Sequence, residues 1–291
     1  MAKDKFALLG TKGVFAVETK EREGKIVPRK VGETKNFNLY FCRSENFPKR
    51  QFILKVSKTI AENPALDREA YILHELRIAA LRIDAELVDS PMNYQIGFPE
   101  VIDSFISEEQ GERRVLVLGF DIGKDFKNAD GEDDLSLLLP ISRIRTRNKE
   151  RVDPKTSAWI LGKALKFLVF FHYLGISVGN LSGGNILIDK EHYVTFFDWS
   201  DVGLDNDGVS SEVACSEISR LAREVITLLT GDPDAEELLD DEHLPDGRYE
   251  KFLFALADGK FESAKRAHKE FYELVENMWG RKFHPYTTYP L

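Results

Sequence analysis

Residues 178–188 read VGNLSGGNILI and residues 195–201 read TFFDWSD. Asn185 precedes a short apolar run in the first stretch, and Asp198 follows one in the second. Both runs have strand length and flank a turn, so we expect a strand pair over 185–189 and 193–198. Amide and carboxylate oxygens are ligands that Mg²⁺ accepts. One interpretation is that Asn185 and Asp198 converge on a metal ion; the other is that Asn185 holds the loop and Asp198 caps a turn.

The apolar pattern on either side of this strand pair changes along the chain. Runs of strand length occur at 37–41, 51–56, 98–107 and 114–120. Helical spacing, with typical start or stop residues, predicts helices that begin at Asn63, at Asp153 and near Cys215, and a last helix over 261–279. A strand-rich first half with one helix therefore precedes a mainly helical second half, with a boundary near residues 119–123.

Lys55 lies inside the apolar run 51–56, where an unpaired ammonium group costs free energy. Glu69, on the helix expected next, is the predicted partner. A Lys55–Glu69 pair would direct the ammonium group toward phosphate oxygens. The alternative is a lysine at a strand edge whose side chain extends to water.

The 291 residues carry a formal net charge of -9, which disfavours nucleic acid and anionic lipid as partners. The two cysteines lie far apart and in no metal-binding spacing, so we expect a reducing, cytoplasmic location. No run of apolar residues is long enough to span a membrane. These properties leave a globular protein that acts away from nucleic acid and membranes as the expectation.

Several pieces of the chain occur in the order and spacing of one known family. Residues 178–185 match the catalytic loop H-R-D-L-x-x-x-N, and Asp198 matches the aspartate of D-F-G. From about Gly32 to Gly231 the chain therefore resembles the protein kinase-like superfamily. Gly179, Gly184 and Asp198-Trp199 are closer to aminoglycoside- and choline-kinase-like enzymes, whereas residues 175–177 and 228–231 look more like protein kinases. The branch of the superfamily stays open.

The resemblance implies an α+β, two-lobed protein kinase-like fold. An antiparallel-sheet N-lobe with one helix would span residues 1–118, including an added N-terminal hairpin at about 1–30. A hinge would span 119–124, and a mainly helical C-lobe 125–291. In this family a strand lysine paired with a helix glutamate holds the nucleotide, and Mg²⁺ bridges the phosphates.

The same resemblance implies that the chain binds ATP and Mg²⁺. Asn185 and Asp198 would be the metal ligands. The residues expected at the nucleotide are Gly32, Leu39, Ile53, Lys55, Glu69, Leu118, Phe120 and Leu187.

The loop departs from the family at its central residue. Asn180 stands where the family has the aspartate that accepts the hydroxyl proton, and an amide takes no proton at neutral pH. Val178 and Ser182 replace a histidine and a lysine of the same loop, and Gly32 alone remains of the glycine-rich cover over the phosphates. Together these changes predict impaired phosphoryl transfer.

Three functions follow from this reading. The first is a pseudokinase that binds Mg²⁺·ATP and regulates or scaffolds an unidentified protein partner. The second is an active atypical phosphotransferase, acting on a protein or small-molecule hydroxyl, in which Asp201 replaces Asn180 as the base. The third is an interaction module that needs no nucleotide. A basic run that contains Arg143, Arg145 and Arg147 is either a solvated loop or a docking site for an acidic partner.

Overall fold

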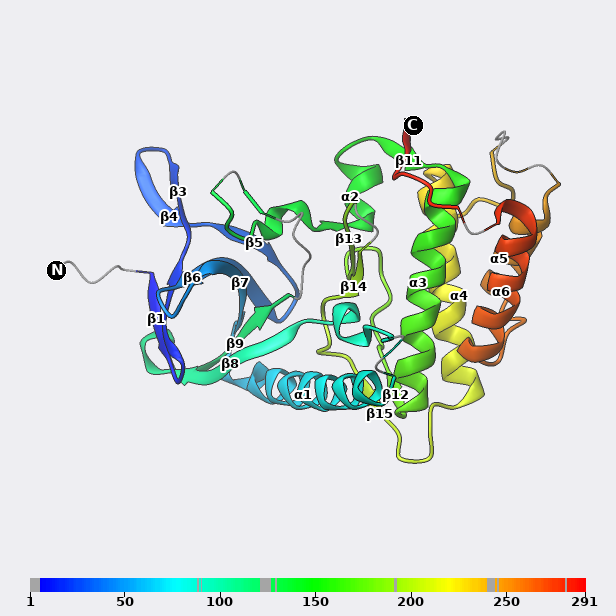
Figure 1. Ribbon diagram of the computed structural model, residues 1–291. Helices are drawn as coiled ribbons and strands as arrows, with labels where there is room; N and C mark the ends of the chain where they lie inside the picture. The colour runs from blue at the N-terminus through cyan, green and yellow to red at the C-terminus, as the bar shows by residue number, and fades with distance from the viewer. Residues whose placement is uncertain are drawn as a thin grey trace. The chain divides into compact units, whose positions relative to one another are not determined.

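The computed structural model of the protein describes residues 6–87, 89, 91–120, 127–128, 130–190, 193–239, 244, 246–280 and 282–291. The chain is a mixed α and β protein (Figure 1) and divides into two compact units, Met1–Leu137 and Leu138–Leu291. Of the hinge predicted at 119–124, Gly119 and Phe120 are described, and the rest lies outside the described residues. None of the helices in these ranges combines the length and apolar character needed to cross a membrane.

The first unit is built on a seven-stranded antiparallel sheet with the order β1-β2-β6-β7-β9-β8. The fifth strand pairs with the first part of β6, and β2 pairs with its last part. The strands are β1 (Ala7–Gly10), β2 (Gly13–Val17), β5 (Lys30–Glu33), β6 (Phe37–Ser44), β7 (Phe47–Ser57), β8 (Glu100–Ser107) and β9 (Arg113–Gly119); β3 (Thr19–Arg22) and β4 (Lys25–Pro28) form a separate hairpin. The four strands predicted in this half are present as β6, β7, β8 and β9.

The sheet of the first unit curls so that β1 approaches β8 at the opposite edge (Figure 1). Asp103 of β8 accepts hydrogen bonds from Thr11 Oγ1 (2.5 Å) and from the Lys12 N–H (2.8 Å), in the turn between β1 and β2. Asp103 lies at a shift in the β8–β9 register, a typical place for a strand to bend. The buried carboxylate therefore joins the two edges of the sheet.

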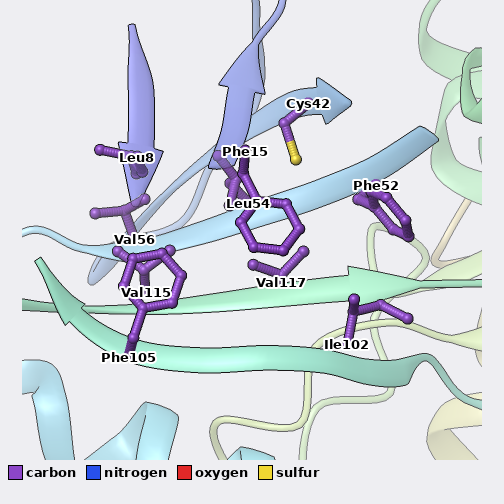
Figure 2. Packing of buried hydrophobic residues seen from close by; sticks show 10 residues of the cluster. All are labelled: Leu8, Phe15, Cys42, Phe52, Leu54, Val56, Ile102, Phe105, Val115 and Val117. Atoms are coloured by element: carbon purple, nitrogen blue, oxygen red, sulfur yellow. The ribbon is translucent and has the colours of Figure 1, made fainter. Parts of the chain in front are cut away.

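Apolar side chains fill the inside of the curled sheet, as Figure 2 shows. Phe15 meets Phe52 edge-on, with ring centroids 6.2 Å apart, and stacks on Phe105 at 6.3 Å. The buried cluster consists of Leu8, Phe15, Cys42, Phe52, Leu54, Val56, Ile102, Phe105, Val115 and Val117. Complete burial of a large apolar side chain stabilises a fold by about 1.5–3 kcal/mol. This core fixes the position of β7, the strand that carries Lys55.

Helix α1 (Asn63–Glu86) begins at a contact with the sheet. Asn63 Oδ1 accepts hydrogen bonds from Ser57 Oγ (2.6 Å), at the end of β7, and from the Arg114 N–H (2.7 Å) on β9. The buried face of α1 comprises Leu66, Glu69, Ile72, Leu73, Leu76, Ala79 and Ala80. Glu69 is thus a charged residue on an otherwise apolar helix face.

Short 3₁₀ helices are η1 (Ile60–Glu62), η2 (Tyr94–Gly97), η3 (Glu108–Gln110) and η4 (Leu135–Leu137).

The second unit is mainly helical, as predicted. Its helices are α2 (Ile141–Thr146), α3 (Pro154–Tyr173), α4 (Ser211–Thr230), α5 (Arg248–Ala257) and α6 (Ala264–Trp279). Helix α3 begins after Asp153, whose Oδ1 accepts from the Thr156 N–H (2.6 Å), and is followed by Gly175 at φ +72°. Helix α4 begins earlier than predicted, because Ser210 Oγ accepts from the Val213 N–H and caps it.

Short strands link the helices of the second unit. A three-stranded antiparallel sheet contains β10 (Leu139–Pro140), β13 (Ile186–Ile188) and β14 (Val194–Phe196). Two further pairs are β11 (Glu150–Val152) with β16 (Thr288–Pro290), and β12 (Ile176–Ser177) with β15 (Gly203–Leu204). The strand pair predicted over 185–189 and 193–198 is present as the shorter β13 and β14. Its turn contains residues 191 and 192, which lie outside the described residues.

Candidate functional site

Lys55 and Glu69 form a buried ion pair within the first unit. Lys55 Nζ lies 2.6 Å from Glu69 Oε2, and both side chains have 0% exposure. The ring centroid of Phe37, on the neighbouring strand β6, lies 4.6 Å from Nζ, so the ammonium group also has a cation–π contact. The predicted pairing is present, and the alternative of a lysine that extends to water is wrong.

Strand register places the other predicted residues of the first unit around this pair. Lys55 on β7 lies opposite Leu39 on β6, and Ile53, two residues earlier, lies opposite Leu118 on β9. Cross-strand partners project from the same face of a sheet. Since side chains alternate along a strand, Ile53 and Lys55 share that face, which carries Leu39 and Leu118 as well. All four side chains are buried, as is Phe120 beyond the end of β9.

Gly32 lies on strand β5, opposite Leu39, rather than in the turn that follows. That turn is closed by the Thr34 N–H, which donates to the Phe37 carbonyl oxygen (2.9 Å), and by Thr34 Oγ1, which accepts from the Phe37 N–H (3.0 Å). A Cβ on Gly32 would meet the Leu39 side chain at 3.8 Å, an ordinary contact. The backbone at Gly32 therefore has no steric need for glycine.

Asn185 and Asp198 are brought together in the second unit. The Asp198 N–H donates to Asn185 Oδ1, and Asn185 Nδ2 donates to the carbonyl oxygens of Asn180 (2.6 Å) and Asp198 (3.0 Å). Asp198 Oδ1 accepts from the Ser200 N–H (3.1 Å). Asn185 thus holds the loop and Asp198 caps a turn, as one of the two sequence interpretations requires.

These contacts leave room for the metal interpretation as well. An amide oxygen has two lone pairs, and the contact with Asp198 uses one lone pair of Asn185 Oδ1. In the described part of the chain, no group of three or more His, Cys, Asp or Glu side chains is placed to hold a metal ion. A metal bound here would need ligands beyond that set.

The loop that contains Asn180 is anchored through its backbone by α4. Glu217 Oε1 accepts from the Gly179 N–H (2.8 Å), and Arg220 Nη1 donates to the Gly179 carbonyl oxygen (3.0 Å). The second oxygen of Glu217 lies 2.7 Å from His172 Nε2, at the end of α3. Asn180 itself uses Oδ1 to accept from the Ser182 N–H (3.3 Å). Helix α4 therefore holds the loop through both the N–H and the carbonyl oxygen of Gly179.

Glu224, one helical turn after Arg220, reaches the other end of the loop. Burial raises the pKa of Glu224, while the Gly183 N–H and the charge of Arg145 act in the opposite direction. The Gly183 carbonyl oxygen accepts from the Ser142 N–H (3.0 Å) on α2. Both α2 and α4 thus determine the path of residues 179–183.

Gly179 has the conformation in this loop that requires glycine. Its φ is +76°, and a Cβ added there would lie 2.2 Å from the carbonyl oxygen of Asp201. Asp201 therefore packs against the residue that precedes Asn180, and its side chain is exposed. The structure brings the predicted substitute base close to the loop along the backbone.

Part of the predicted basic docking site has contacts within the second unit. Arg145 Nη1 donates to the carbonyl oxygen of Gly231 (3.2 Å), just after α4. Arg143 is half-buried, and Arg147 is exposed. Of these three arginines, Arg147 is the most exposed.

Sequence reasoning missed the residues that hold the loop in place. Glu217, Arg220 and Glu224 project from one face of α4, at helix positions i, i+3 and i+7. Glu217 is buried together with apolar residues of α4, and the sequence pattern of the helix does not distinguish it from an exposed glutamate. Phe37, over the Lys55 ammonium group, was expected only as a strand residue.

Comparisons with known proteins leave the residues themselves as the evidence. A scan against protein-family models found no model that matches this chain, and a search of the curated proteins found no match either.

Proposed function

We propose that the chain is a kinase-like protein that binds Mg²⁺·ATP, is impaired in phosphoryl transfer, and acts as a regulatory or scaffolding pseudokinase. The observation that carries the proposal is the buried pair of Lys55 and Glu69, at 2.6 Å and 0% exposure. A buried ion pair is often no more stabilising than an apolar pair of similar volume, so stability alone gives little reason for it. A lysine oriented by a helix glutamate is a phosphate-binding device of protein kinases.

The oxygen donors of the second unit fit the metal that this function needs. Mg²⁺ is commonly held by one or two protein oxygens, with water and substrate phosphates as the remaining ligands. The Asp198 carboxylate and the remaining lone pair of Asn185 Oδ1 are such donors, and their segments are held together by hydrogen bonds. A metal held there would neutralise charge on the nucleotide phosphates.

Asn180 supports the proposal that phosphoryl transfer is impaired. Its amide can donate or accept a hydrogen bond but cannot remove a proton from a hydroxyl group at neutral pH. Loss of a general base typically lowers a rate by about 10²–10⁴-fold. We therefore propose that nucleotide binding acts through an interaction with a protein partner, rather than through a phosphorylated product. The low cysteine count remains the ground for proposing a cytoplasmic location.

Thermal unfolding with and without Mg²⁺·ATP tests the proposal. A ligand at about 100 times its Kd, bound by the folded state alone, adds about 2.7 kcal/mol, or a melting-temperature increase of roughly 5–10 °C for this size. Asp198→Asn is the matched variant, because an amide oxygen can still accept from the Ser200 N–H while the carboxylate charge is gone. We expect the increase in wild type and its loss in Asp198→Asn. A wild-type protein whose melting temperature is unchanged at millimolar Mg²⁺·ATP contradicts the proposal.

An active atypical phosphotransferase is the second candidate, favoured by the position of Asp201 against Gly179. In this function Asp201 accepts the hydroxyl proton of a protein or small-molecule substrate. Asp201→Asn should then abolish turnover of ATP, and Asn180→Asp should raise it. Unchanged turnover in both variants rules the second candidate out.

The third candidate function is an interaction module that needs no nucleotide. It is the function that remains when the wild-type protein binds no nucleotide. In either protein-binding function, Arg147 and the half-buried Arg143 are the proposed contacts for an acidic partner. Arg145 is the weaker candidate of the three, because its guanidinium group already binds the Gly231 carbonyl oxygen.

A further inference from the structure

Helix α1 carries apolar side chains on the face turned away from the sheet. Its buried face packs against β8 and β9, the strands beside which α1 lies in Figure 1. On the opposite face, Tyr71, Ile78 and Leu81 are 57%, 49% and 49% exposed. Single exposed apolar residues are normal on a protein surface, whereas a contiguous row of them marks an interaction site.

These exposed residues follow the repeat of a coiled coil. Five exposed residues of α1 are separated alternately by three and four positions: Tyr71, His74, Ile78, Leu81 and Ala85. Residues with this spacing form a straight row along a helix, and two helices pack through such rows. We call these five residues the α1 seam.

Two opposite charges flank the α1 seam on one side. Glu75 and Arg82 each follow a seam residue directly, and both are exposed. They lie about 10.5 Å apart along the helix axis, too far for an ion pair with each other. Among the described residues, neither has an oppositely charged partner. A second α1 helix that runs in the opposite direction presents the same two charges in reverse order.

We propose that the chain forms a homodimer in which the α1 seams of two copies pack against each other in antiparallel orientation. Ile78 of one copy lies level with Leu81 of the other, and Glu75 pairs with Arg82 of the other copy. Two-fold symmetry makes each of these contacts occur twice. The proposal goes beyond the proposed function, since it requires no nucleotide.

Other arrangements of the two helices fit less well. If one helix slides by a heptad, Glu75 meets Glu75 of the other copy and Arg68 meets Arg82, so like charges are adjacent. A slide of two heptads pairs Arg68 with Glu75 but moves Leu81 to the first turn of the other helix. In a parallel pair, Arg77 and Arg82 flank the seam together. The proposed register combines apolar contact with opposite charges.

A contact through one helix of each copy covers less area than a standard protein interface. Interfaces of this class are typical of weak and transient complexes. We therefore expect dimerisation to be visible between micromolar and millimolar protein concentrations. Sedimentation equilibrium of the full chain without nucleotide over this range measures the dissociation constant.

Ile78→Lys tests the apolar part of the interface. A lysine at the centre of the seam should weaken dimerisation at least about tenfold, because apolar contact is lost twice and two charges are placed together. Ile26→Lys is the matched control, since Ile26 on β4 is also an exposed isoleucine and lies outside the seam. It should dimerise as wild type does.

Charge reversal tests the orientation. Glu75→Arg and Arg82→Glu should each dimerise about tenfold more weakly, because two exposed ion pairs become two repulsive pairs. An equimolar mixture of the two variants should dimerise as strongly as wild type, since each copy then meets the opposite charge. Arg68→Glu, which makes the same charge change on the same helix, should have no effect.

Each part of the proposal can fail separately from the proposed function, because no nucleotide is present. A wild-type protein that stays monomeric up to millimolar concentration overturns the proposal. A dimer that Ile78→Lys leaves intact uses another surface and also overturns it. If the mixture of Glu75→Arg and Arg82→Glu dimerises no better than the separate variants, or if Arg68→Glu is equally disruptive, the antiparallel pairing is wrong.

Discussion

Replacement of Lys55 by Met tests whether the buried pair has the strength that its geometry implies. Methionine fills a similar volume but leaves the Glu69 carboxylate buried, where its partner had been 2.6 Å away. Removal of one partner of a buried ion pair costs about 3–5 kcal/mol, because a charge remains without compensation. Neither side chain has any exposed surface, so solvent cannot take over the missing contact. We expect Glu69→Leu, which leaves the ammonium group, to cost about as much.

The double variant Lys55→Met, Glu69→Leu gives the decisive comparison. Replacement of both partners by apolar groups is often neutral or even stabilising, so a loss of about 0–2 kcal/mol is expected. The two single variants together lose about 6–10 kcal/mol, which gives a coupling energy of about 4 kcal/mol or more. Urea unfolding followed by circular dichroism measures all four proteins under one condition.

The Arg266–Glu270 pair on α6 is a matched control for burial. Arg266 Nε and Glu270 Oε1 lie 2.8 Å apart, close to the separation of the buried pair, but the side chains are 64% and 42% exposed. The same cycle there should show a coupling near zero, since solvent screens the pair. A coupling at Lys55–Glu69 that is as small as at Arg266–Glu270 would refute the reasoning that burial makes this pair strong.

Three other variants test the loop, the sheet closure and one titrating group. Gly179→Ala should destabilise the fold by about 1–3 kcal/mol, because residue 179 has a left-handed backbone and no room for a Cβ. Gly184→Ala is its control, since a Cβ there meets Ser182 Oγ at 3.9 Å, and equal melting temperatures of the two variants would contradict the explanation. Asp103→Ala should cost about 1–3 kcal/mol in urea unfolding, because the Lys12 N–H and Thr11 hydroxyl lose their acceptor; an unchanged midpoint would show that the closure contributes nothing. Burial raises the pKa of Glu224, so its contribution to stability is present below an unfolded-state pKa near 4.5 and is lost as pH rises through the folded-state pKa. The melting temperature of Glu224→Gln should therefore rise relative to wild type between about pH 4 and pH 7, and a constant difference over that range would contradict this sign.

The elements that were predictable from the sequence are those whose limits are set by local chemistry. Helix α3 is an example, because Asp153 caps its start and Gly175 follows its end in a left-handed conformation. Helix α5 was not predicted. Its N-cap residue is Gly247, which has no side chain to cap the helix, so the sequence shows no capping pattern there. Strands β11 and β16 were missed for another reason, since segments of three residues carry no periodicity and pair across a long stretch of chain.

The candidate site was predictable where a residue violates its local pattern. Lys55 is a charge within an apolar strand, and that conflict predicted a partner such as Glu69, with a lysine that extends to water as the alternative. Glu217 gave no such conflict, because a glutamate on a helix of ordinary amphipathic character needs no explanation. Its function as an acceptor for the Gly179 N–H depends on how α4 lies against the loop, which only the tertiary structure determines.

The contacts of the loop show that its geometry does not depend on the side chain at residue 180. Asn185, Glu217 and Arg220 hold the loop through the backbone atoms of Gly179 and Asn180, so these bonds are independent of the side chain at residue 180. The side chain itself contributes one acceptor, to the Ser182 N–H, and an aspartate or an asparagine oxygen serves equally well there. Stability therefore places little constraint on the choice between aspartate and asparagine at this position. The loop geometry is therefore independent of the charge of the side chain at residue 180, which is what the proposed loss of proton transfer without loss of binding requires.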